Sequence, residues 1–129
     1  MASDPAPGLG IVISAGDHNA AHAAFVLAAG AAALGRAVVI FATNAGCRAL
    51  LADLSGLTGA EREAALAARG VSGIAALRAA VAELGGRMIA CTGGLRAEGL
   101  EGAALAPGVE AGGVVTFLAA VEGFQLLGG

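Results

Sequence analysis

The sequence predicts an α/β fold, a three-layer α/β/α domain built on a mostly parallel sheet of four to five strands. Short apolar runs rich in β-branched residues alternate with longer Ala-rich stretches of helical spacing, which is typical of β-α-β units. The short runs are apolar at successive positions, as expected for strands that helices cover on both faces. With 129 residues the chain has the length of one domain, which we expect to span residues 1–129.

The individual elements follow from these patterns and from the glycines that separate them. The strand-helix-strand unit over residues 9–42 should have a right-handed crossover. The expected elements are a strand at 9–14, a helix at about 18–34, a strand at 37–42, a short helical piece at about 47–53, helices at about 59–68 and 73–84, a strand at 87–91, a short helix ending at 99, a strand at 109–111, a helix at 114–122 and an edge strand at 124–127.

Three polar residues are expected to cap helices. Asp17 stands directly before the first helix, where a carboxylate accepts from free backbone N–H groups. Thr58 and Glu61 have the spacing of a capping box, which predicts a helix that runs to about residue 68. Ser72 is the expected cap of the next helix.

The helix expected at 73–84 is amphipathic. Its apolar residues recur at three- and four-residue spacing, at positions 74, 77, 81 and 84. We therefore expect this face to pack on the sheet, with Arg78 and Glu83 pointing away from it.

The composition predicts self-association. Hydrophobic residues make up 57% of the chain and charged residues 13%, an apolar excess that a small monomer could not easily bury. A membrane span is the other explanation for such a chain. The uncharged run at 23–35 is shorter than the roughly 20 residues that a spanning helix needs, so we expect no membrane segment and a homo-oligomer instead.

The charged residues exclude several classes of function. The net charge is -3, and the seven basic residues are arginines spread along the chain, which gives no basic patch for nucleic acid. Since the chain has no lysine, it cannot form a Walker-type phosphate loop or a Schiff base. No cofactor is expected. Residues 1–7 carry no secretory signal, so we expect a cytoplasmic protein whose two cysteines stay reduced.

Cys91 is the residue at which we expect the function. It ends the strand at 87–91 just before a helix N-terminus, where open α/β sheets bind their ligands. The free N–H groups and partial positive charge of that helix end favour a thiolate over a thiol. Gly93 and Gly94 let the backbone approach a small anion or a sulfur atom closely, because neither has a Cβ. Arg96 adds a positive charge in the first helical turn.

The other cysteine and the two histidines have simpler interpretations. Cys91 itself could be a buried small hydrophobe, and for Cys47 packing is favoured over function although Arg48 follows it. His18 and His22 are four residues apart on one helical face, a spacing that can bind a metal. Because no third ligand is evident, we predict no metal site.

Three stretches of the sequence resemble the DsrE/DsrF-like family, which includes sulfur-relay subunits of bacterial sulfur oxidation and tRNA thiolation. Ser14-Ala15-Gly16-Asp17 followed by His22 resembles the exit of the family's first strand. Residues 37–43 resemble its second strand, which ends at Thr43. Residues 91–100 (CTGGLRAEGL) resemble the segment in which active members carry the sulfur-accepting cysteine.

This resemblance implies a function and a set of site residues. It implies a five-stranded domain that assembles as homotrimers or homohexamers and accepts a persulfide sulfur on Cys91 for transfer to a partner protein. The substrate-binding residues would be Asp17, His22, Thr43, Thr92, Gly93, Gly94 and Arg96. The alternative is a non-catalytic oligomeric module that binds a small anion or nucleotide-like ligand in the crevice at the strand ends. A purely structural scaffold is the third interpretation.

Overall fold

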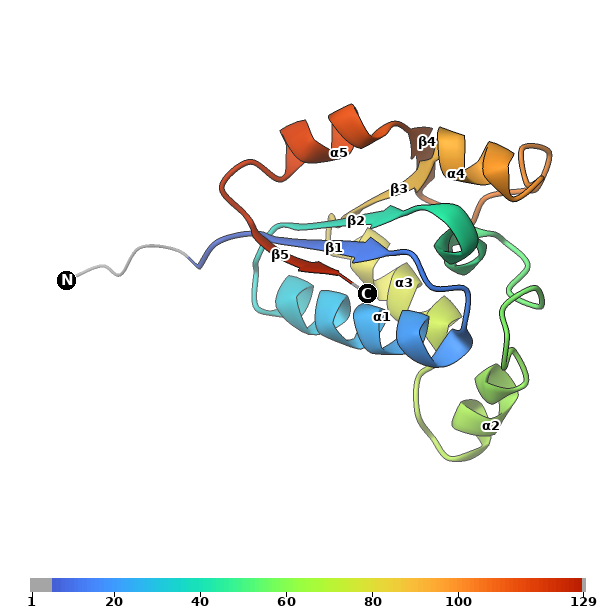
Figure 1. Ribbon diagram of the computed structural model, residues 1–129. Helices are drawn as coiled ribbons and strands as arrows, with labels where there is room; N and C mark the ends of the chain where they lie inside the picture. Colours follow the sequence, from blue (N-terminus) through green and yellow to red (C-terminus); the bar gives the residue numbers. More distant parts are fainter. Residues whose placement is uncertain (1–5, 129) are drawn as a thin grey trace.

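The computed structural model describes residues 6–128 and confirms the α/β fold (Figure 1). Residues 1–5, which belong to the segment searched for a secretory signal, lie outside the described residues. The elements are β1 (Leu9–Ile13), α1 (His18–Ala33), β2 (Val38–Ala42), the 3-10 helix η1 (Asn44–Leu50), α2 (Arg62–Ala68), α3 (Ile74–Glu83), β3 (Arg87–Cys91), α4 (Thr92–Ala97), β4 (Val109–Gly112), α5 (Val114–Ala120) and β5 (Gln125–Gly128).

The strands of residues 6–128 form one sheet of five in the order β4-β3-β2-β1-β5, and every pairing is parallel. The carboxyl ends of all the strands therefore lie at the same edge of the sheet. β5, the last strand in chain order, pairs with β1, and Leu9 lies opposite Gln125. Arg36 reinforces this pairing because its side chain donates to the Pro7 carbonyl at 2.8 Å and to Gln125 Oε1 at 2.9 Å.

The sheet carries a hydrophobic cluster on each face, which makes the three predicted layers. In Figure 1, α1 and α3 cover one face and α5 lies on the other. The larger cluster, on the α1 side, includes the fully buried Phe25 and Ile40. On the α5 side, Phe117 stacks on Phe41 of β2 with ring centroids 4.9 Å apart. In residues 6–128, none of the helices combines the length and hydropathy that crossing a bilayer requires.

The expected outward orientation of Arg78 in α3 is wrong. Its side chain is 7% exposed, and Nη1 donates to the carbonyls of Ala49 at 2.9 Å and Leu51 at 2.7 Å. α3 lies beside the end of η1 as well as on the sheet, and the carbonyls there accept from a buried guanidinium. The expected inward position of Leu84 is also wrong, because α3 ends at Glu83 and Leu84 is 56% exposed.

Of the three predicted caps, only Asp17 is confirmed. Its carboxylate accepts from the Ala20 N–H at 3.0 Å. Thr58 does not open α2, because its backbone pairs with Gly16 and His18 in an isolated bridge beside the start of α1. Ser72 does not cap α3, which begins after Gly73.

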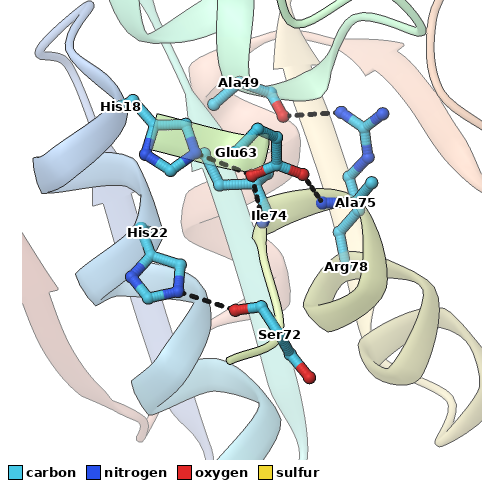
Figure 2. Close-up of polar contacts among 8 residues, drawn as sticks. All are labelled: His18, His22, Ala49, Glu63, Ser72, Ile74, Ala75 and Arg78. Carbon is cyan, nitrogen blue, oxygen red and sulfur yellow. Dashed lines mark hydrogen bonds and ion pairs between the residues drawn. The ribbon is translucent and has the colours of Figure 1, made fainter. Parts of the chain in front are cut away.

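The N-terminus of α3 is capped from another helix. Glu63 of α2 accepts from the N–H groups of Ile74 at 2.8 Å and Ala75 at 3.2 Å, and also contacts His18 Nε2 at 2.7 Å (Figure 2). One carboxylate thereby joins α1, α2 and α3. Local sequence could not show this cap, because it depends on α2 folding back over the start of α3.

Candidate functional site

Cys91 links β3 directly to α4 with no intervening loop. It is the last residue of β3 and the N-cap of α4, and its Sγ accepts from the Gly94 N–H at 3.3 Å. The side chain is partly exposed, and it borders the hydrophobic clusters on both faces of the sheet. An N–H group aimed at sulfur binds a thiolate more strongly than a thiol, because hydrogen bonds to an ionised acceptor are the stronger ones.

The two glycines after Cys91 have different surroundings. A Cβ on Gly94 would lie 2.5 Å from the Asn44 backbone nitrogen and 3.1 Å from Cys47 Sγ. α4 can therefore pack against the start of η1 only because residue 94 has no side chain. A Cβ on Gly93 would meet Cys91 Sγ at an ordinary 3.8 Å. Thr92 and Gly93 are exposed, and Cys91 itself is partly exposed.

Cys47 lies beneath the site and is fully buried. Its Sγ is 3.5 Å from the Ala42 carbonyl oxygen and 3.9 Å from that of Cys91. Burial, together with the negative charge that Cys91 can carry, raises the pKa of the Cys47 thiol to about 11. Cys47 is therefore a neutral thiol at physiological pH and packs under Cys91. This agrees with the packing role that the sequence favoured for it over a functional one.

The charged groups at the site divide into a pair and a free cation. Arg48 of η1 forms an ion pair with Glu98, directly after α4, and so ties the two elements together. Neither partner was singled out from the sequence, because they are 50 residues apart and only the fold brings them together. Arg96 is exposed and makes no hydrogen bond within residues 6–128.

The structure places the three remaining candidate residues at three different positions. Thr43 lies beside Cys91, since its Cα is 3.1 Å from the position of a Cβ on Gly94. Asp17 lines a polar cavity of about 460 Å³ near the ends of β1 and β2, which it shares with Arg48 and Thr58. His22 faces the start of α3, and its Nε2 bonds the Ser72 carbonyl at 2.9 Å (Figure 2).

The two histidines of α1 stack on each other with ring centroids 5.8 Å apart. His18 is fully buried and bonds Glu63, and its Nδ1 has no partner within residues 6–128. The described part of the chain contains no group of three His, Cys, Asp or Glu side chains that could hold a metal ion. This pair therefore belongs to the contact between α1, α2 and α3.

Comparison with known proteins finds that part of the chain is similar to one protein family. The model of the DsrE/DsrF/DrsH-like family matches residues 6–57, and this confirms the resemblance found in the sequence. No curated protein matches the sequence.

Two solved structures are similar to this chain in fold. One is a protein of unknown function, MTH1491 from Methanobacterium thermoautotrophicum, with a TM-score of 0.64 and 19% identity over 95% of this chain and 99% of that one. The other is the ychN protein from E. coli, with a TM-score of 0.66 and 14% identity over the same shares of the two chains.

Proposed function

We propose, from the match to the DsrE/DsrF/DrsH-like family and from the geometry at Cys91, that this protein is a sulfur carrier that holds sulfane sulfur on Cys91. The observation that carries the proposal is a partly exposed cysteine at a strand end whose Sγ accepts a backbone N–H. Cys91 lies beyond the matched residues 6–57, so the assignment of this cysteine depends on its own surroundings.

The proposed uptake step is a nucleophilic displacement at sulfur. The Cys91 thiolate attacks the outer sulfur of a donor such as thiosulfate, a Cys91–sulfur bond forms, and the donor's sulfur–sulfur bond breaks to release sulfite. The product is the anion Cys91–S–S⁻, so charge is conserved. A thiolate of an acceptor protein then takes the outer sulfur by the same displacement and leaves the Cys91 thiolate.

The residues around Cys91 have separate parts in this proposal. The Gly94 N–H stabilises the attacking thiolate, and exposed Thr92 and Gly93 leave room for the donor. Arg96 is the free cation that attracts an anionic donor. Cys47, buried and protonated, supports the site without reacting.

Sulfur uptake by purified protein tests the proposal. After incubation with thiosulfate or polysulfide, we expect the intact mass to rise by one sulfur atom in the wild type and in Cys47→Ala, and to stay unchanged in Cys91→Ser. Treatment with a reductant should remove the added sulfur. A wild-type protein that gains no sulfur while Cys91 alkylates readily would rule out the carrier function.

A binding module is the second candidate function. The polar cavity with Asp17 and Arg48 favours it, because that cavity offers groups of both charges at the carboxyl edge of the sheet. In that case Cys91→Ser would leave ligand binding intact, which separates the two functions.

The proposed carrier works as a homo-oligomer, a trimer or hexamer. Several large apolar side chains of α1 and its C-cap, β5 and α5 are exposed, and an apolar surface of this kind is typical of subunit contacts. They are Val26, Leu27, Leu34, Val114, Val115, Leu118, Leu126 and Leu127. The proposal includes a cytosolic location, where free thiols persist.

Sedimentation equilibrium checks the assembly. We expect the wild type to have three or six times the chain mass, and Leu27→Glu to shift the equilibrium towards smaller species. Glu83→Gln is a control, because it changes an exposed residue of α3 outside this surface. A wild type that sediments as a monomer at micromolar concentration contradicts the assembly.

A further inference from the structure

A groove on the outer side of α3 is separate from the residues around Cys91. Its volume is about 390 Å³, within the roughly 300–1,000 Å³ typical of small-molecule sites. Ala75, Ala79 and Ala82 form its floor along one face of α3, and Pro107 and Gly108 form the opposite wall. The fold thus leaves a mostly apolar groove beside a helix.

Arg78 is the charged residue of this groove and one of the most buried polar residues described. Both hydrogen bonds of its guanidinium come from Nη1, which donates to Ala49 and Leu51. Within residues 6–128, the hydrogen bonds to Ala49 and Leu51 use Nη1 alone, although a guanidinium carries five N–H donors.

The guanidinium lies beside the wall of the groove. The Ala106 N–H donates to the Leu50 carbonyl at 2.9 Å, so the turn at 106–108 is held against the segment whose carbonyls bind Arg78. Arg78 itself lines the groove, so the residue that binds these carbonyls also borders the groove.

The charge of Arg78 is not fully balanced inside the protein. The negative charge of Glu63 stabilises the positive charge of Arg78. This carboxylate, however, already binds His18 and two backbone N–H groups. Burial lowers the pKa of Arg78 more than Glu63 raises it. An anion in the groove would supply the missing charge and accept the free N–H groups, because a guanidinium fork matches a carboxylate.

We propose that this groove binds a small organic carboxylate with a short aliphatic chain, its carboxylate on Arg78 and its chain along the alanines of α3. The residues that line the groove account for both the carboxylate and the aliphatic chain of this ligand. The residues that line the groove include no acidic side chain to repel an anion, and the alanine floor offers carbon atoms alone. The inference is independent of the sulfur chemistry at Cys91.

Hexanoate is the probe, and amide chemical shifts of ¹⁵N-labelled protein are the measurement. We expect saturable shifts in α3 and at 106–108 with a Kd of about 1 mM, and binding of hexan-1-ol or sulfate at least about tenfold weaker, because each lacks one half of the ligand.

Two leucine variants on α3 make the test specific. Ala79→Leu fills the groove without touching Arg78 and should weaken hexanoate binding at least about tenfold. Ala76→Leu places the same side chain on an exposed position of α3 outside the lining and should leave Kd unchanged. Hexanoate that causes no shifts, that binds Ala79→Leu as tightly as the wild type, or that binds no better than hexan-1-ol overturns the proposal.

Discussion

Replacement of Gly94 by alanine is expected to lower the free energy of unfolding by about 2 kcal/mol and to slow sulfur uptake by Cys91. The new Cβ would lie 2.5 Å from the Asn44 backbone nitrogen, which is part of the main chain and cannot rotate away. α4 must therefore move off η1, and the Gly94 N–H then moves with it, away from Cys91 Sγ. Alanine has a higher helix propensity than glycine by about 1 kcal/mol, which offsets only part of this cost.

Gly93→Ala is the matched control for that variant. It brings the same gain in helix propensity, but its Cβ makes only an ordinary contact with Cys91 Sγ. Chemical denaturation should show Gly93→Ala as stable as the wild type or slightly more stable, with Gly94→Ala clearly less stable. Equal stability of the two variants would mean that α4 does not pack against η1 as described.

Replacement of Glu63 by alanine is expected to destabilise the protein by about 2 kcal/mol near neutral pH. The change removes the partner of His18 Nε2, and the His18 ring is fully buried with its other nitrogen already unpartnered. It also leaves the first N–H groups of α3 without their acceptor. Glu61→Ala is the matched control, because Glu61 is an exposed neighbour on the same turn that makes no capping hydrogen bond.

The effect of Glu63 should depend on pH in a defined direction. Burial alone would raise the pKa of Glu63, but hydrogen bonds from His18, Ile74 and Ala75 outweigh burial and lower it below 4.5. A carboxylate with a lowered pKa stabilises the fold fully above its unfolded pKa and loses this effect as the pH falls through the folded one. Denaturation at pH 7 and at pH 3 should therefore show a smaller difference between wild type and Glu63→Ala at the lower pH. A difference that grows on acidification contradicts the assignment.

The strands could be predicted closely because their burial on both faces leaves a direct mark in the sequence. The run at 9–14 became β1 at Leu9–Ile13, and the strand at Arg87–Cys91 was predicted to the residue. Glycines between the elements marked most of the remaining boundaries. Cys91 could be singled out because strand, cysteine and helix start are consecutive in the chain.

Contacts between distant segments could not be predicted in the same way. Helical periodicity separates a sheet-facing side of α3 from an opposite side, but Arg78 contacts neither the sheet nor solvent alone: it donates to carbonyls at the end of η1. Glu63 and His18 are 45 residues apart, and nothing local indicates their pairing. For the same reason Asp17 and His22, which lie near each other in the sequence, contact different parts of the fold.

The parallel pairing of β1 with β5 has a consequence for how the chain folds. β1 is synthesised before the other four strands of this sheet, yet one of its two edges has no partner until Gln125 and its neighbours have been made. At about 5–20 residues per second, that edge stays open for several seconds or more. The contact also closes the largest loop among the strand pairings, which makes it costly in chain entropy and slow to form. Until β5 is made, β2 occupies one edge of β1 and the other edge is unpaired, and an unpaired strand edge can pair with other chains.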